Sequence, residues 1–149
     1  MSGAVRLVSL QPRPTAVVVA TTTWADFPSQ WKPMLDKVWG FLRTAPPGLY
    51  KDGHNIMLYK DSVPNVEVGV QVNRGFEPRG EVRPSSLPGG TAATATHAGP
   101  MDKIGDTHQA VRAWCADHGR HLTGVCWEIY GDPDPATGQF VVDVFWLVT

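Results

Sequence analysis

Apolar and polar residues recur with regular periods along the first half of this chain. An apolar run at residues 4–10 and a valine- and threonine-rich run at residues 15–24 predict two strands, separated by a proline-rich break. Between Trp31 and Leu42, apolar residues recur at helical spacing. We therefore expect an amphipathic helix here, with Pro33 in its first turn, because a first-turn proline removes no needed donor.

Two further strands are expected after this helix, which residues 45–48 (APPG) end. Residues 55–60 form one apolar run, and residues 66–72 alternate valine with other residues. Strict alternation is typical of a strand with one buried face, so residues 66–72 are expected to be half-buried. The two runs predict a hairpin.

A similar order of elements returns after residues 74–90, which are rich in Pro, Gly, Arg and Glu and predict an exposed connector with a short strand near Val82. Residues 91–97 predict a strand. The following helix opens at Gly99-Pro100 and ends before Gly119. The last two strands are expected at residues 125–130 and 140–148.

The chain thus has a strand–helix–strand–strand order written twice. This order predicts a single α+β domain over residues 1–149, with a first repeat at 15–73, the connector at 74–90 and a second repeat at 91–149. Each helix would cover one face of an antiparallel half-sheet. A concave cleft between two pseudo-symmetric halves is a natural ligand site.

Composition narrows the classes of partner. The formal net charge is −1 with 18% charged residues, so there is no basic excess for a nucleic-acid partner. The sequence contains no apolar run long enough for a membrane span and no secretory signal, which favours a cytoplasmic protein. Cys115 and Cys126 are expected to be free thiols, as in a reducing compartment. The spacing of Cys and His predicts no metal site, and no cofactor motif is present.

Glu128 stands inside an apolar, aromatic run at residues 125–130, the first part of the stretch VCWEIYGDP at residues 125–133. On a strand, Cys126, Glu128 and Tyr130 share one face. A buried Glu needs a partner. Spacing leaves open whether that partner belongs to the protein or is a ligand. The six tryptophans are equally consistent with core packing and with a surface that binds flat, apolar molecules.

The second half resembles the GyrI-like small-molecule-binding domains. The residues that carry the resemblance are His97, Gly99 and Pro100, followed after a helix by Trp127, Glu128, Tyr130, Asp132 and Pro133. VEVGVQV at residues 66–72 looks like the family's first-half hairpin strand. One position departs from the family pattern, because Met101 stands where the family has tyrosine after Gly-Pro. No helix-turn-helix segment precedes residue 15, so no direct contact with DNA is expected.

The resemblance implies that Glu128 faces a cavity and pairs with cationic, aromatic ligands. Its expected neighbours in that cavity are Tyr130, Tyr59, Trp39 and Trp146, with His97 and Met101 as further ligand contacts. Other roles stay open for these residues: Trp39 lies on the apolar face of its helix, where core packing is the alternative, Tyr130 has the alternative of a hydroxyl at the surface, and His97 is placed to cap the Gly-Pro turn.

Three functions follow from the resemblance. The first is binding of hydrophobic, often cationic, planar aromatic molecules for drug sequestration or sensing. The second is hydrolysis of cyclopropane-bearing alkylating natural products, in which the catalytic residues would be Glu128, to orient or activate water, and Tyr130 or Tyr59, to assist. The third is a protein-interaction role such as gyrase inhibition.

Overall fold

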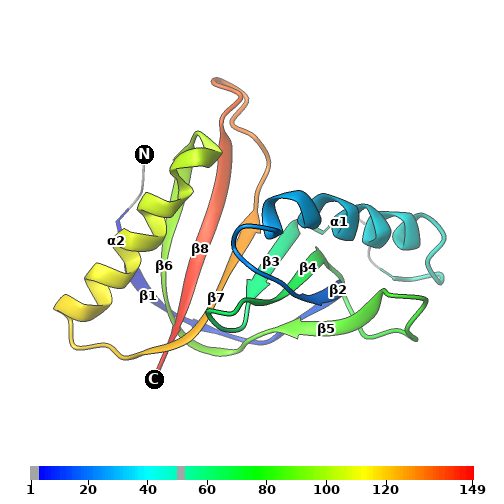
Figure 1. Cartoon of the computed structure of the whole chain (residues 1–149), viewed down its shortest axis with the longest axis horizontal. Helices are drawn as coiled ribbons and strands as arrows, with labels where there is room; N and C mark the ends of the chain where they lie inside the picture. The colour runs from blue at the N-terminus through cyan, green and yellow to red at the C-terminus, as the bar shows by residue number, and fades with distance from the viewer. Residues whose placement is uncertain (1–3, 50–52) are drawn as a thin grey trace.

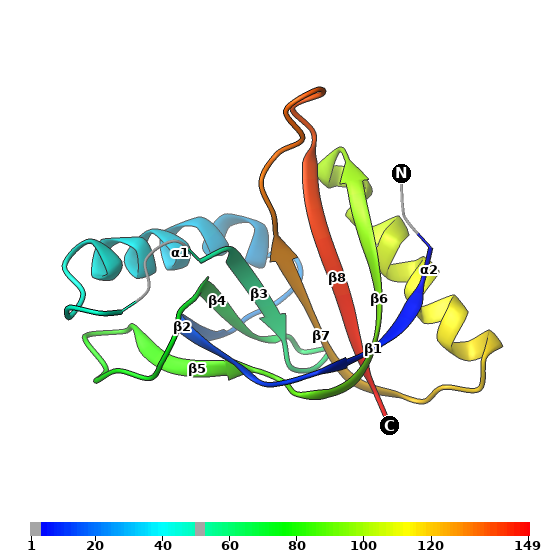
Figure 2. The same ribbon diagram turned by 180° about the vertical axis from the view of Figure 1, so that it is seen from behind.

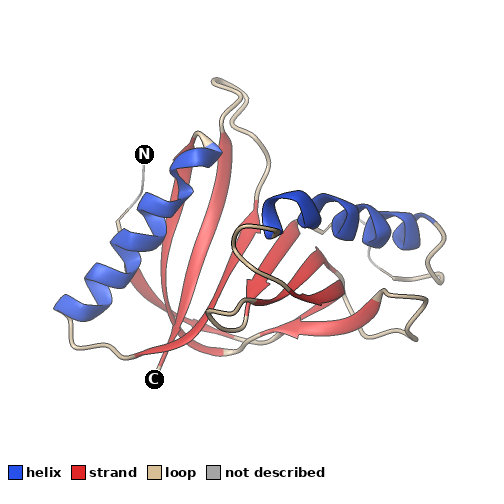
Figure 3. Cartoon of the chain, viewed as in Figure 1, coloured by secondary structure: helices blue, strands red, loops and turns tan. Residues whose placement is uncertain are grey.

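A computed structural model describes residues 4–49 and 53–149. It contains eight strands and two α-helices (Figures 1 and 3). In chain order the elements are β1 (Arg6–Leu10), β2 (Arg13–Thr21), α1 (Phe27–Arg43), β3 (Asn55–Tyr59), β4 (Asn65–Gln71), β5 (Arg83–Leu87), β6 (Gly90–Gly99), the 3-10 turn η1 (Met101–Lys103), α2 (Ile104–Asp117), β7 (Leu122–Tyr130) and β8 (Phe140–Val148).

All strands join one antiparallel sheet in the order β1-β6-β8-β7-β3-β4-β2-β5. The two halves meet where β3 pairs with β7, with Met57 opposite Glu128. The order β6-β8-β7 on one side mirrors β2-β4-β3 on the other. The predicted α+β fold with pseudo-symmetric halves is therefore confirmed.

Each half lends its first strand to the other half. β1 precedes β2 in the chain but pairs with β6 of the second half, with Arg6 opposite Thr94. In the same way β5 precedes β6 but pairs with β2 of the first half. Figure 2, from behind, shows the two crossing segments side by side at the back of the sheet. The halves are thus interlocked at both outer edges.

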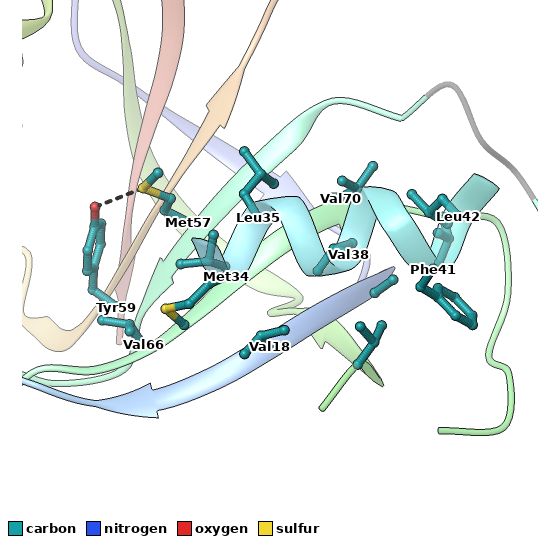
Figure 4. Close-up of a cluster of buried hydrophobic side chains, with 14 of the residues drawn as sticks. Val18, Met34, Leu35, Val38, Phe41, Leu42, Met57, Tyr59, Val66 and Val70 are labelled. Carbon is teal, nitrogen blue, oxygen red and sulfur yellow. Dashed lines mark hydrogen bonds between the residues drawn. The ribbon is translucent and has the colours of Figure 1, made fainter. Parts of the chain in front are cut away.

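Both helices cover the same face of the sheet. In the first half, Met34, Val38 and Leu42 of α1 pack on Val68 and Val70 of β4 (Figure 4). In the second half, Val111 and Cys115 of α2 pack on alanines of β6 and valines of β8. The period of apolar residues in the sequence predicted both contact faces.

The opposite face closes over a separate apolar cluster. Trp127 of β7 is 1% exposed and stacks on Phe145 of β8, with ring centroids 5.3 Å apart. The same cluster includes Val17 of β2, Leu87 of β5 and Ala92 of β6. The strands next to the two crossing segments therefore cover the middle of the sheet. Trp127 and these three residues are therefore buried by strands of the same sheet, and neither described helix lies over them.

Three local predictions were wrong. The first concerns α1, which begins at Phe27 with Pro28 in its first turn, so Pro33 lies inside the helix. Because Pro33 has no backbone N–H, the carbonyl of Ser29 loses its intrahelical partner. Both residues are exposed, so this carbonyl remains accessible to water.

The other two concern burial. β4 is buried on both faces, because Glu67 lies inside the protein, where Lys60 (Nζ to Oε2, 2.5 Å) and Ser85 (Oγ to Oε1, 2.5 Å) satisfy its carboxylate. The connector is not an exposed loop throughout. The predicted short strand near Val82 is present as β5, but Val82 before this strand is 4% exposed within the α1 core.

Two finer predictions, on Gly119 and on the cysteines, are confirmed. Gly119 follows α2 with φ +67°, a left-handed conformation that glycine adopts without strain. Cys115 and Cys126 are free and buried. Among the described residues, neither helix combines the length and apolar character needed to span a lipid bilayer.

Candidate functional site

A large cavity lies between the two halves, above the junction of β3 and β7. Its volume is about 1020 Å³. α1 forms one wall, η1 and the start of α2 form the other, and β3 and β7 form the floor. The described lining residues are Phe27, Pro28, Trp31, Leu35, Trp39, Gly53, His54, Asn55, Met57, Tyr59, Met101, Ile104, Glu128, Tyr130, Gly131, Asp132, Pro133 and Phe140.

Glu128 is the charged group in the floor of this cavity. Its residue is 4% exposed. Oε1 accepts hydrogen bonds from the hydroxyls of Tyr130 at 2.6 Å and Tyr59 at 3.1 Å, and Oε2 lies 2.7 Å from Nε2 of His108. No lysine or arginine of the described chain makes an ion pair with it. Its protein partners are thus two phenols and an imidazole.

A second hydrogen bond fixes the role of His108. The indole N–H of Trp146 donates to Nδ1 of His108 over 3.0 Å. Since an indole nitrogen only donates, Nδ1 must accept, and the imidazole proton is on Nε2. His108 therefore donates a hydrogen bond to Glu128 as a neutral ring and adds no positive charge to the cavity floor.

Tyr59 and Tyr130 are held as donors. Burial, followed by the charge of Glu128, raises the pKa of both hydroxyls above the usual value of 10.0. The ring of Tyr59 packs between Trp24 and Phe27, with centroid distances of 5.4 and 5.8 Å. Its hydroxyl also lies 3.5 Å from Sδ of Met57, a weak acceptor (Figure 4). Both phenols therefore stay protonated and directed at the carboxylate.

The walls are aromatic and the lining carries negative charge. Six of the lining residues carry a phenyl, phenol or indole ring: Phe27, Trp31, Trp39, Tyr59, Tyr130 and Phe140. The indole N–H of Trp39 is bound by Asn55 Oδ1 at 2.9 Å, so its satisfied ring needs no polar partner from a ligand. Asp132 adds a second carboxylate in the loop after β7, and the described lining contains neither lysine nor arginine. The lining therefore combines aromatic ring faces with carboxylate groups.

The thiol nearest this site is not a nucleophile at neutral pH. Cys126 lies on the same strand face as Glu128, and burial, helped by the Glu128 charge, raises its pKa to about 12. Among the described residues there is no cluster of three or more His, Cys, Asp or Glu that could hold a metal ion. The chemistry available in the floor is therefore that of a carboxylate with phenol donors.

The predicted site residues separate into two groups. Glu128, Tyr130, Tyr59, Trp39 and Met101 line the cavity. Trp146 and His97 do not line it. Trp146 lies behind His108, and Cζ of Arg112 lies 5.3 Å from the centroid of its ring.

His97 instead joins β6 to α2. It is 1% exposed, with Nδ1 2.9 Å from the Thr107 hydroxyl and Nε2 2.8 Å from the Pro100 carbonyl. Both nitrogens are thus used within the protein, as the alternative of a turn-capping histidine anticipates.

Sequence analysis missed His108. Its position on the apolar stripe of α2, beside Ile104 and Val111, was the available signal, because a polar residue on a buried helix face needs a partner. The partner lies on another strand and could not be identified from helical spacing.

Comparison with known proteins agrees with this geometry. A family model described as a GyrI-like small molecule binding domain matches residues 4–149. Among curated proteins, no relative matches the sequence.

Solved structures share the fold at low identity. The C-terminal domain of EcmrR is similar with a TM-score of 0.79 and 20% identity, over 98% of this chain and 97% of that one. SAV2435 bound to tetraphenylphosphonium gives 0.70 and 11%, over 98% and 94%. A hydrolase from Listeria innocua gives 0.61 and 10%, over 97% and 91%.

Proposed function

Because this chain belongs to the GyrI-like small-molecule-binding domain family, we propose that it binds hydrophobic, cationic, planar aromatic molecules in the cavity between its halves. The observation that carries the proposal is a buried carboxylate, Glu128, whose protein partners are neutral donors. A ligand cation supplies the opposite charge that these partners lack. Sequestration or sensing of such molecules, in the reducing cytoplasm that the two free thiols suit, is the proposed role.

Two kinds of contact support this ligand class. The charge of Glu128 attracts a cation at the floor, where the low exposure limits screening by solvent. The faces of Trp31 and Trp39 are available for stacking and for cation–π attraction. SAV2435, which shares the fold, binds a lipophilic cation, tetraphenylphosphonium. An apolar cation therefore suits both the floor and the walls.

The test is a titration with a matched ligand pair: a planar N-methylacridinium cation and its neutral acridone counterpart, followed by calorimetry. Glu128→Gln should weaken binding of the cation by about 20- to 100-fold, since the attraction between two unit charges roughly 6–10 Å apart, at an effective dielectric constant of about 20, is about 1.7–2.8 kcal/mol. Binding of the neutral compound should change little.

Glu67→Gln is the control for this experiment. Glu67 is also a buried carboxylate, but it lies among Lys60 and Ser85 and does not line the cavity. Cation affinity should be unaffected by this change in folded protein. Equal affinity of the wild type for cation and neutral compound, or equal loss in both variants, would contradict the proposal.

Hydrolysis is the second candidate, since a carboxylate and two phenol hydroxyls lie within hydrogen-bonding distance in one cavity. The hydroxyls of Tyr59 and Tyr130 already donate their single protons to Glu128, so neither is free to assist a reacting substrate. This is why binding is placed first. Ring-opened product from a cyclopropane-bearing alkylator, detected by mass spectrometry and lost in Glu128→Gln, would reverse the order.

A further inference from the structure

We propose that this cavity selects tertiary ammonium ligands, with one N–H on the cation, over quaternary cations and over amidinium-like groups. The inference rests on the proposed function and refines its ligand class. It follows from counting how many acceptor positions of Glu128 the protein leaves free.

Three of the four acceptor positions of the Glu128 carboxylate are occupied. An ionised carboxylate offers two positions on each oxygen. The hydroxyls of Tyr59 and Tyr130 take both positions on Oε1, and Nε2–H of His108 takes one on Oε2. One acceptor position therefore remains, on Oε2.

The hydrogen bond from His108 cannot be given up to free a second acceptor position on Glu128. The N–H of Trp146 donates to its Nδ1 over 3.0 Å, which keeps the proton on Nε2 and directs it at Oε2. Turning the ring by half a turn would place the carbon Cε1 against the carboxylate and the carbon Cδ2 against the indole N–H, so both hydrogen bonds would be lost. The imidazole is also only 14% exposed at its side chain, so water does not readily replace either bond. Trp146 and His108, which lie behind the cavity floor, therefore keep one acceptor position of Oε2 occupied.

A single free position matches a single N–H. A tertiary ammonium donates once to Oε2 and presents its remaining substituents to aromatic walls such as Trp31 and Trp39. A quaternary ammonium keeps the charge but has no proton to donate. An amidinium prefers two parallel bonds, one to each carboxylate oxygen, and Oε1 has no position for the second. A primary ammonium would bring two further N–H groups for which Glu128 has no acceptor position.

The test uses one planar aromatic scaffold carrying a dimethylamino, trimethylammonium, amidine or neutral isopropyl group on the same linker. Calorimetric titration at pH 7 should rank the protonated dimethylamino compound about 10-fold tighter than the trimethylammonium compound, which corresponds to one charge-assisted hydrogen bond. The amidine should also bind more weakly than the dimethylamino compound.

Tyr130→Phe removes one donor from Oε1 and leaves the ring in place. The affinity of the amidine relative to the dimethylamino compound should rise in this variant, a change of preference that loss of packing alone would not produce. Tyr59→Phe removes the other donor from β3 and makes the same prediction if the first variant does not fold.

The outcomes separate the two proposals. Equal or tighter binding of the trimethylammonium compound, with both cations weakened by Glu128→Gln, overturns the N–H selectivity and leaves cation binding intact. An unchanged amidine preference in both folded tyrosine variants also overturns it. If the isopropyl compound binds as tightly as the cations, cation binding and the N–H selectivity both fail.

Discussion

Gly69 of β4 is a position where a single methyl group should separate two strands. An ideal Cβ there would lie 1.8 Å from the carbonyl oxygen of Ala16 and 2.8 Å from Cα of Val17, both backbone atoms of β2. Ordinary contact needs more than 3 Å, so β2 and β4 would have to move apart by over an ångström. The ladder between these strands, from Thr15 opposite Gln71 to Thr21 opposite Asn65, cannot keep its hydrogen bonds around such a shift.

The expected cost of Gly69→Ala is about 3–5 kcal/mol, from two ladder hydrogen bonds at about 1 kcal/mol each and about 1–3 kcal/mol of overpacking. That is a large part of the roughly 5–15 kcal/mol that stabilises a domain. Urea denaturation followed by tryptophan fluorescence measures it as a lowered midpoint. Ligand affinity should fall too, because β4 supports β3 and thereby Tyr59.

Gly40→Ala is the matched control. Gly40 lies in α1, and a Cβ there would meet no heavy atom within 4 Å. Alanine favours the helix by about 1 kcal/mol over glycine, so this variant should be slightly more stable than the wild type. The reasoning fails if Gly69→Ala unfolds within about 1 kcal/mol of the wild type, or if both variants lose stability equally.

Two further predictions concern raised pKa values. The pKa of Tyr59 and Tyr130 is raised by burial, so folding favours their neutral form. The stabilisation that comes from these neutral phenols should be fully present below pH 10, and the free energy of unfolding should fall as the pH rises above this value. Absorbance at 295 nm should show that both phenols ionise only when the protein unfolds. Reversible ionisation near pH 10 in folded protein would contradict this. Burial also raises the pKa of Cys115, and that of Cys126 to about 12, so neither thiol should react with Ellman's reagent at pH 8 until denaturant is added. Rapid labelling of native protein would disprove their inaccessibility.

Much of the fold could be predicted from the sequence because local periods reflect burial. The apolar spacing of α1 and α2 identified both contact faces, and the alternation around Glu128 placed this residue on one face with Cys126 and Tyr130. Burial of the second face of β4 could not be predicted, because it depends on Lys60 and β5, which belong to other parts of the chain. Alternation reports one covered face and contains no information about what packs on the other.

The candidate site divides in the same way. Glu128 and Tyr130 come from one strand, so their proximity follows from spacing. The contact of Tyr59 with Glu128 depends on the pairing of β3 with β7, which only the complete sheet order determines. The contacts of His108 and Trp146 cross between α2, β7 and β8. Side chains from separate elements meet through tertiary packing, which no sequence window contains.

The exchange of edge strands between the halves has a consequence for folding kinetics. Arg6 pairs with Thr94 and Arg13 with Leu87, so neither half can complete its sheet before most of the chain is available. Such contacts of large sequence separation slow folding, because the entropy of closing the long loops is lost before the contacts form. The cavity floor, where β3 meets β7, also exists only once the halves have joined. A ligand bound there should therefore act on the native state, lengthening its lifetime against unfolding while leaving the folding rate almost unchanged.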